Sequence, residues 1–195
     1  DNYEKKEYLD IMLQEINHIS DITSEMLFLA KPEQAKWESY SISRLLDELC
    51  VLIESEALLK NINLVRSYDP SLPETLINLS GMKQAFINIV NNAIQAMSNG
   101  GTMTIRSELD PTKNLLRLFF TDTGPGIPPE QVTRIFEPFY TSKADGTGLG
   151  LTTAYRVIQD HGGQIRVEST LGGGTTFINE IPLRFVTGYQ APGSQ

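Results

Sequence analysis

The chain has 195 residues, of which 40% are hydrophobic and 21% are charged, a balance typical of a globular protein with a buried core. Its formal net charge of −8 argues against the phosphate backbone of a nucleic acid as a partner. The single cysteine, Cys50, cannot form an internal disulfide and indicates a reducing compartment. No run of residues is apolar enough to cross a bilayer, and no signal peptide opens the chain. We therefore expect a cytoplasmic fragment without membrane contact of its own, whereas its full-length parent can carry an anchor elsewhere.

Residues 1–31 are predicted to form one long helix. Apolar side chains recur at alternating four- and three-residue steps from Tyr8 to Leu29, and Lys31-Pro32 ends the pattern. A stripe of this width needs a partner helix. Residues 32–40 are expected to be a linker.

An α/β domain is predicted over residues 41–185. The expected helices are 41–60, a helix capped by Ser80 and running to Met97, and 149–160. The expected strands are 61–68, a short one near 76–77, a hairpin of 102–108 and 115–122, and a last pair at 164–169 and 176–183. Residues 123–148 read as a long irregular stretch, which is usually functional or disordered. This order predicts a two-layer α/β sandwich, a mixed sheet with helices on one face. Residues 186–195 are expected to be a flexible tail.

Two asparagines mark the middle of the helix that ends near Met97. Asn88 and Asn92, within Asn-Ile-Val-Asn-Asn-Ala, are four residues apart and share one helical face beside apolar core positions. They either cap local backbone groups or face a ligand. The poor helix propensity of asparagine favours a ligand.

Asp122 begins a turn, Asp-Thr-Gly-Pro-Gly, directly after a strand. A carboxylate in this place can accept a hydrogen bond from an exocyclic amine. Gly124 and Gly126 allow the backbone to approach a flat ring closely. A plain turn with aspartate as its first residue would explain the same residues.

A glycine-rich loop leads into the helix at 149–160. Its residues are Gly146, Thr147, Gly148, Leu149 and Gly150. Free N–H groups and the positive end of a helix suit a phosphate at this place. No Gly-Lys-Ser/Thr follows, which excludes a Walker A loop, and the spacing does not fit a dinucleotide-binding fingerprint.

In this order the three elements resemble the N, G1 and G2 boxes of the histidine-kinase branch of the ATPase superfamily that also includes gyrase, heat-shock chaperones and MutL. Residues 136–139, Phe-Glu-Pro-Phe, resemble the F box, and residues 172–177 resemble the closing Gly-x-Gly-Thr element. The short segment Thr141-Ser142-Lys143 before the glycine-rich loop, called the lid below, is similar to the lid of sporulation-type and nitrogen-regulation-type sensor kinases. The resemblance covers residues 41–185 and implies a Bergerat-type ATP-binding fold. It also implies that residues 1–31 are the second helix of a dimerisation and phosphotransfer hairpin.

The resemblance implies roles at the base end of the site. Asp122 would bind the adenine amino group, and Thr175 would assist through an ordered water. Gly124 and Gly126 would lie beside the ring.

At the phosphate end, the resemblance implies that Asn92 coordinates Mg²⁺ and that Asn88 contacts the phosphates or the metal shell. The glycine-rich loop from 146 to 150 would donate N–H groups to the phosphates. Gln95 stands where relatives often carry a basic residue, which leaves its contact with the phosphates open. Lys143 can reach the terminal phosphate as a mobile point charge, or it is a solvated loop lysine.

Asn88 also separates the branches of the superfamily. Branches that hydrolyse ATP place a glutamate four residues before the metal-binding asparagine, and that carboxylate activates water. The amide of Asn88 has no useful basicity. The resemblance therefore implies a protein-histidine kinase that keeps the γ-phosphate for a histidine and then for a response-regulator aspartate.

Neither histidine of the chain is the expected acceptor. No acidic residue follows His18, and His161 precedes two glycines at a helix end, where it can cap carbonyl groups. We expect the acceptor on a helix outside this sequence, in the same or a partner subunit of a homodimeric full-length protein. Two alternatives remain: an ATPase of the same superfamily, and a non-catalytic module for which ATP is only a conformational ligand.

Overall fold

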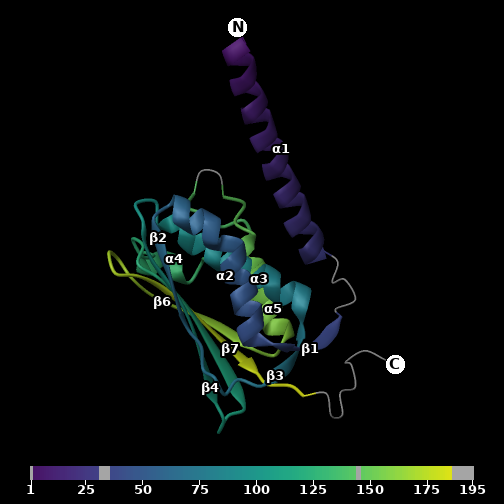
Figure 1. Ribbon diagram of the computed structural model, residues 1–195. Helices are drawn as coiled ribbons and strands as arrows, with labels where there is room; N and C mark the ends of the chain where they lie inside the picture. The colour runs from purple at the N-terminus through teal and green to yellow at the C-terminus, as the bar shows by residue number, and fades with distance from the viewer. Residues whose placement is uncertain (1, 31–35, 144–145, 186–195) are drawn as a thin grey trace.

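The computed structural model describes residues 2–30, 36–143 and 146–185 (Figure 1). Residues 31–35, which include the first four residues of the predicted linker, and the predicted tail at 186–195 lie outside the described residues. So do Asp1 and residues 144–145, directly after the lid.

A five-stranded mixed sheet forms one layer of the domain. Its strand order is β2-β4-β5-β7-β6, with β2 parallel to β4 and the other neighbours antiparallel. The strands are β2 (Ile62–Ser67), β4 (Gly101–Asp110), β5 (Leu115–Asp122), β6 (Gln164–Thr170) and β7 (Gly174–Pro182). The predicted hairpin of β4 and β5 is confirmed.

Three helices cover one face of this sheet (Figure 1). They are α2 (Ile42–Leu59), α3 (Leu79–Ala96) and α5 (Gly150–Asp160), and a short α4 (Pro129–Val132) lies in the long loop after β5. The core lies between the two layers, where Phe86 of α3 meets Phe120 of β5 with ring centroids 5.1 Å apart. The predicted two-layer α/β sandwich is thus confirmed.

Strand β5 aims one functional residue at the helices by simple alternation. Leu116, Leu118, Phe120 and Asp122 are buried, while the residues between them are less buried. Because side chains alternate between the faces of a strand, Asp122 points the same way as Phe120, toward the helical layer. The last residue of β5 is therefore a carboxylate at the edge of the apolar core.

Two local predictions were wrong. Residues Trp37–Ser41, expected mostly in a linker, form β1, which pairs antiparallel with β3 (Glu74–Asn78). Asn78, and not Ser80, caps α3, because the Asn78 Oδ1 accepts a hydrogen bond from the Gly81 N–H at 3.2 Å. The Ser80 hydroxyl lies inside the helix and donates to the same oxygen at 3.0 Å. The first error depends on pairing with a distant strand, whereas the second reflects the choice between two neighbouring residues that can both cap a helix.

His161 ends α5 as a buried structural residue. Its side chain is 2% exposed, and its Nδ1 lies 2.7 Å from the Val157 carbonyl. Its Nε2 accepts a hydrogen bond from the Asn78 N–H at 3.0 Å, so the ring is neutral with its proton on Nδ1. Burial lowers the pKa of His161. The predicted capping of a carbonyl is confirmed, and the ring also joins the end of α5 to the start of α3.

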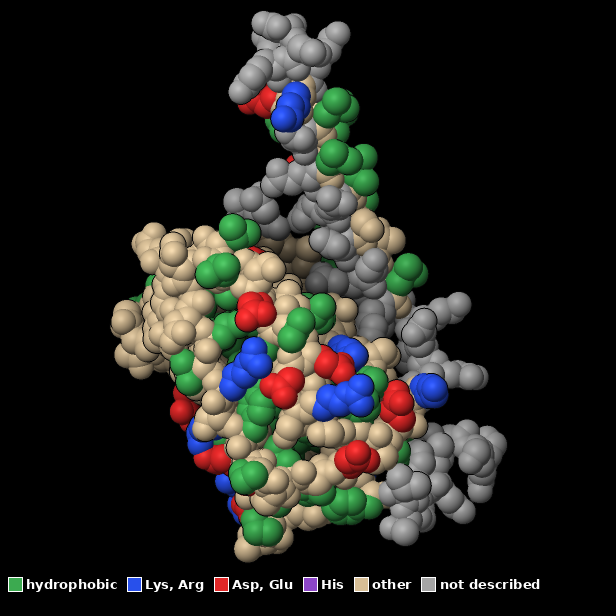
Figure 2. Space-filling model, viewed as in Figure 1, with side chains coloured by type: hydrophobic (Ala, Val, Ile, Leu, Met, Phe, Trp, Pro, Cys, Tyr) green, Lys and Arg blue, Asp and Glu red, His purple; other side chains and the backbone are tan. Residues whose placement is uncertain are grey.

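Helix α1 (Asn2–Ala30) projects from the sandwich, as Figure 1 shows, and contacts it at α5. Hydrophobic side chains lie along it, whereas charges of both signs are interspersed over the helical layer (Figure 2). The exposed apolar residues of α1 are Tyr8, Leu9, Ile11, Met12, Leu13, Ile16, Ile19, Met26 and Leu27. Each is at least half exposed, so these side chains of the predicted apolar stripe are not packed against other described residues. No helix among these residues is both long and apolar enough to cross a membrane.

Candidate nucleotide site

Asp122 lies at the end of the candidate site that is predicted to bind the adenine base, called the base end below. Its side chain is 3% exposed, and its Oδ1 accepts a hydrogen bond from the Gly124 N–H at 2.8 Å. Burial raises the pKa of Asp122, while hydrogen bonds from the N–H groups of Gly124 and Thr175 act in the opposite direction. A buried carboxylate that is only partly satisfied by backbone donors can bind an amine of a ligand.

Ser169 supports Thr175, and no local sequence pattern marks it for this role. Thr175 lies opposite Asp122 in the β5–β7 register, and its Oγ1 is 2.9 Å from the Ser169 Oγ. The Ser169 Oγ also accepts from the Ile127 N–H at 2.7 Å and donates to the Gly174 carbonyl at 3.0 Å. Because the Ser169 hydroxyl donates its one proton to the Gly174 carbonyl, its oxygen accepts the hydrogen bond from the Thr175 hydroxyl. The lone pairs of the Thr175 hydroxyl then face away from Ser169.

Two glycines are required where the backbone segments of the base end meet. Gly174 has φ +90°, and a Cβ there would lie 2.1 Å from the Asp122 carbonyl oxygen. Gly126 has φ +75°, and a Cβ there would lie 2.1 Å from the Thr170 carbonyl oxygen. Any side chain at either position would push these strand ends apart. The first contact could not be read from the sequence, because residues 122 and 174 are brought together only by the sheet.

Asn88 ties α3 to the first residue of α5. Its Nδ2 donates to the Gly150 carbonyl at 3.0 Å, and its Oδ1 accepts from the Gln84 Nε2 at 3.0 Å. Gln84 was not singled out from the sequence, although it precedes Asn88 by four residues on the same helical face. The two contacts fix the Asn88 amide beside the start of α5, where the glycine-rich loop ends.

Lys143 reaches from the lid to α3. Its Nζ donates to the Asn92 Oδ1 at 2.8 Å and to the Gln95 Oε1 at 2.8 Å. Burial, and to a lesser degree the charge of Lys60, lowers the pKa of Lys143. A cation thus lies on two amide oxygens of the predicted phosphate end, and the interpretation of Lys143 as a solvated loop lysine was wrong.

The F box and the glycine-rich loop are joined by their backbones. The Phe139 N–H donates to the Gly148 carbonyl at 3.0 Å, and a Cβ on Gly148 would lie 2.4 Å from the Phe139 carbonyl carbon. Phe139 has φ +65° and a ring that is 64% exposed. A left-handed conformation is costly for a bulky residue, so the contact between these two segments maintains it.

Helix α5 begins without help from its N-cap side chain, because that residue is Leu149. The Leu149 N–H donates to the Thr147 Oγ1 at 3.2 Å, and the Gly146 N–H donates to the Lys143 carbonyl at 3.3 Å. The first N–H groups of a helix have no partner within it, and they can bind an anion. The start of α5 at Gly150 therefore suits a phosphate.

Helix α3 connects the two ends of the site. A Cβ on Gly124 would lie 3.4 Å from the Ala96 Cβ, which places the Asp122 turn against the last residue of α3. Asn92, with Lys143 on it, lies one turn earlier on the same helix. The site is therefore elongated, with a carboxylate at one end and amides, an ammonium group and a helix start at the other.

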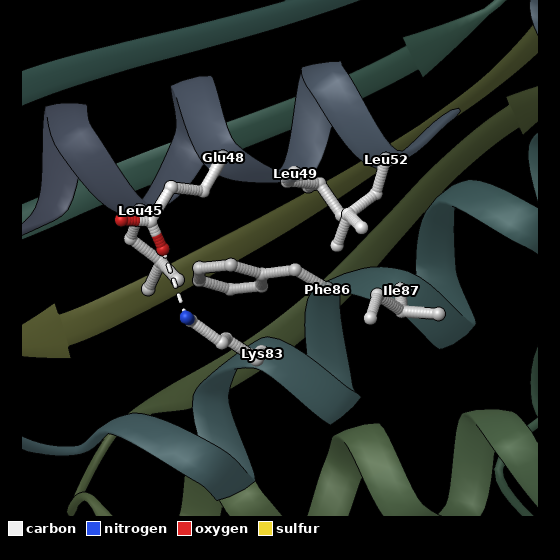
Figure 3. A pocket seen from close by; sticks show the side chains of 7 residues that line it. All are labelled: Leu45, Glu48, Leu49, Leu52, Lys83, Phe86 and Ile87. Carbon is white, nitrogen blue, oxygen red and sulfur yellow. Dashed lines mark ion pairs between the residues drawn. The ribbon is translucent and has the colours of Figure 1, made fainter. Parts of the chain in front are cut away.

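A small apolar hollow, apart from the candidate site, lies between α2 and α3 (Figure 3). Leu45, Leu49, Leu52, Phe86 and Ile87 line it, and the Glu48–Lys83 ion pair of 2.8 Å crosses one side. This ion pair, with the Tyr40 hydroxyl, lowers the pKa of Glu48 to about 2. The Glu48 carboxylate and the Lys83 ammonium group neutralise each other across the two helices. The side chains that line the hollow therefore offer no unpaired charge to a nucleotide.

Residues 78–185 match the family described as histidine kinase-, DNA gyrase B- and HSP90-like ATPase. The match covers more than half of the chain and contains every residue of the site. The chain belongs to this ATPase family. The predicted family and fold are confirmed, and so is the prediction of an ATP-binding domain of the histidine-kinase type.

Histidine kinases are also the relatives of this ATPase-family chain. Sporulation kinase C of Bacillus subtilis is 34% identical over 183 residues, which are 93% of this chain and 42% of the relative. The structure of full-length ShkA in complex with AMPPNP has a TM-score of 0.82 at 26% identity, over 94% of this chain and 40% of ShkA. Histidine kinase ThkA in complex with the response regulator TrrA has a TM-score of 0.76 at 31% identity, over 90% of this chain and 50% of that chain. The chain thus spans half or less of the length of these proteins.

The donor set of this ATPase-family site fits magnesium through amide oxygen and not through a carboxylate cluster. Among the described residues, no three His, Cys, Asp or Glu side chains are grouped to hold a metal. Asn92 presents its Oδ1 to the Lys143 ammonium, so this oxygen already accepts a cation. Mg²⁺ commonly combines few protein oxygens with phosphate oxygens and water, and Asn92 can be such a ligand.

Proposed function

We propose that this chain is the ATP-binding catalytic part of a two-component sensor histidine kinase. It binds Mg-ATP and presents the γ-phosphate to a histidine outside this sequence, from which the phosphate passes to a response-regulator aspartate. The structure of ShkA with AMPPNP and that of ThkA with its response regulator support both steps by similarity.

At the base end, Asp122 accepts a hydrogen bond from the adenine amino group. Its burial makes this contact strong, since water does not compete for the carboxylate. Thr175 assists through an ordered water, and Gly124 and Gly126 let the backbone lie close to the ring.

At the phosphate end, Asn92 holds Mg²⁺, which neutralises phosphate charge when it is bound. Asn88 orients the start of α5, whose N–H groups, together with the loop 146–150, bind the phosphates. Lys143 adds a positive charge at the terminal phosphate, with Gln95 beside it. These are contributions of positioning and charge, on which phosphoryl transfer mainly depends.

The amide at position 88 carries the choice of a kinase over an ATPase. Its nitrogen donates to the Gly150 carbonyl and its oxygen accepts from Gln84, so both ends of the group are engaged. An amide cannot take a proton from water at neutral pH. Bound ATP is therefore kept for a protein acceptor.

Helix α1 fits the second helix of a dimerisation hairpin. Its exposed apolar stripe, from Tyr8 to Leu27, needs helices against it. We infer that the preceding helix of the hairpin, which carries the acceptor histidine, and the same hairpin of a second subunit cover this stripe in the full-length homodimer.

Transphosphorylation tests this function. The chain is mixed with γ-labelled Mg-ATP and with the isolated acceptor hairpin of its full-length parent. We expect label on the hairpin, and hydrolysis of ATP near background. Asp122→Ala should abolish the transfer, whereas Asp47→Ala, a change of an exposed carboxylate on α2, should not.

Other outcomes separate the alternatives. Rapid hydrolysis without label on the hairpin would make the chain an ATPase. Binding of Mg-ATP with neither hydrolysis nor transfer would make it a non-catalytic module.

A further inference from the structure

The Lys143 ammonium lies where a cation of the nucleotide complex would be expected. It donates to the Asn92 Oδ1, which is the one protein oxygen assigned to Mg²⁺ in the proposed function, and to the Gln95 Oε1. Both distances are 2.8 Å, which is short for an N–H···O contact and typical of a charge-assisted hydrogen bond. An ammonium group and Mg²⁺ cannot both use this oxygen at close range, since like charges a few ångströms apart repel.

Gln95 gives the ammonium group a second place to bind. It is exposed, and it follows Asn92 by three residues, so its side chain lies on the same face of α3. Glutamine offers a neutral oxygen, which can hold the lysine without cancelling its charge. A lysine at this position would instead repel Lys143. The amide at 95 and the lysine in the lid therefore complement each other.

We propose that the Lys143 ammonium group occupies the Asn92 oxygen before the nucleotide binds and that Mg-ATP displaces it from this oxygen. The ammonium group then binds the terminal phosphate and keeps its hydrogen bond to Gln95. This inference rests on the proposed function. No covalent step is involved, because one hydrogen bond of the ammonium group is exchanged for another. Gln95 is a positioning residue in this exchange.

The exchange makes the site distinguish ATP from ADP. With Mg-ATP, the lysine loses Asn92 and gains the γ-phosphate. With Mg-ADP, it loses Asn92 and finds no terminal phosphate at the same place. Lys143 thus favours the triphosphate and opposes the diphosphate, which is the product of the transfer and has to leave.

Binding of Mg-ADP and of the non-hydrolysable Mg-AMPPNP, measured by calorimetry on the whole chain, tests this proposal. Lys143→Met should weaken Mg-AMPPNP on the order of tenfold, the effect of one hydrogen bond to a charged group. The same variant should bind Mg-ADP as tightly as the wild type, or a few-fold tighter, since the competitor for Asn92 is gone. Opposite or unequal effects on the two nucleotides are the decisive readout.

Two further variants and one control sharpen the test. Gln95→Met keeps the size of the side chain and removes its oxygen, so it should weaken Mg-AMPPNP a few-fold and leave Mg-ADP unchanged. Lys143→Arg should restore part of the preference for the triphosphate. Lys113→Met, in the exposed turn between β4 and β5 at the far end of β5 from Asp122, should change neither affinity.

Equal weakening of both nucleotides by Lys143→Met would overturn the proposal, because the lysine would then bind a phosphate that ATP and ADP share. Unchanged affinities would overturn it as well. In both cases the wild type still binds Mg-AMPPNP, and the proposed function stands. A folded wild type that binds neither nucleotide would remove the proposed function and, with it, this inference.

Discussion

The two ends of the nucleotide site are built in different ways. At the base end, Asp122, Thr175 and Ser169 are positioned by the register of β5, β7 and β6, and the first two are at most 5% exposed. At the phosphate end, side chains of α3 meet a single lysine from the lid, and Gln95 is exposed. The base end is therefore part of the folded core, whereas the phosphate end can rearrange without loss of the core. Changes at the first should affect binding and stability together unless they keep the shape, and changes at the second should affect binding alone.

Asp122→Asn should have the largest effect on nucleotide binding, and it separates the effect on binding from the effect on stability. The variant keeps the size of the side chain and an oxygen for the Gly124 N–H, but it replaces the charged acceptor for adenine. We expect ATP affinity to fall on the order of 100-fold, which corresponds to about 2–3 kcal/mol for a hydrogen bond to a charged group. Calorimetry at neutral pH measures this loss, with Asp47→Asn as the matched surface control. A loss of less than about threefold would place adenine elsewhere.

Gly174→Ala should give the largest loss of stability. The new Cβ would meet the Asp122 carbonyl, and alanine would have to adopt φ +90°. We expect the free energy of unfolding to fall by about 2 kcal/mol or more. Urea denaturation checks this, with Gly172→Ala as the control, since Gly172 also has positive φ but nothing within 4 Å of its Cβ. If the two variants were equally stable, the close approach of β7 to Asp122 would not matter.

Ser169→Ala should reduce stability and binding by smaller amounts. The change leaves the Ile127 N–H without its acceptor and the Thr175 hydroxyl without its partner. We expect a loss of about 1–2 kcal/mol in the free energy of unfolding, and a several-fold weaker affinity for ATP. The same urea titration and calorimetry measure both, and Ser169→Thr, which keeps the hydroxyl, should recover part of each. Unchanged ATP affinity in Ser169→Ala would show that Thr175 does not depend on Ser169.

The pH dependence of stability sharpens the contrast at Asp122. Burial raises its pKa in the folded state above the ordinary value of 3.8. A group with a raised pKa contributes stability below its unfolded pKa and loses that contribution as the pH rises through its folded pKa. Asp122→Asn removes this loss, so the variant should be at least as stable as the wild type at pH 7, and its relative advantage should disappear near pH 3.8. A variant that is less stable at pH 7 would mean that the charged carboxylate stabilises the empty site.

Lys143→Met and Gln95→Met should have the smallest effect on stability. Neither side chain belongs to the core, and burial of the Lys143 charge is itself unfavourable. We expect changes within about 0.5 kcal/mol in the free energy of unfolding, although both variants alter nucleotide preference. A large loss in thermal unfolding would show that the lid contact is part of the folded core after all.

Much of the domain could be predicted from local sequence patterns. The limits of α2, α3, α5, β5 and β6 lie within two residues of those expected, because apolar periodicity and glycine stops are local signals. Asn88, Asn92, Asp122 and the loop 146–150 could likewise be singled out, since their spacing relative to a strand or a helix is contained in short segments. The amide at position 88, on which the proposed choice of a kinase over an ATPase depends, is likewise a single residue that the family resemblance points out.

Contacts between distant segments were decided only by the tertiary structure. β1 forms because β3 pairs with it, and His161 becomes a neutral acceptor because the end of α5 meets the Asn78 N–H. The strand order β2-β4-β5-β7-β6 places Ser169 behind Thr175, and it brings Gly174 against Asp122. The contact of Lys143 with Asn92 spans 51 residues and depends on the path of the lid over α3. Apolar periodicity predicts which side of a helix or strand faces inward, but not which residue it contacts there. In this site, those contacts depend on the strand order of the sheet and on the position of the lid.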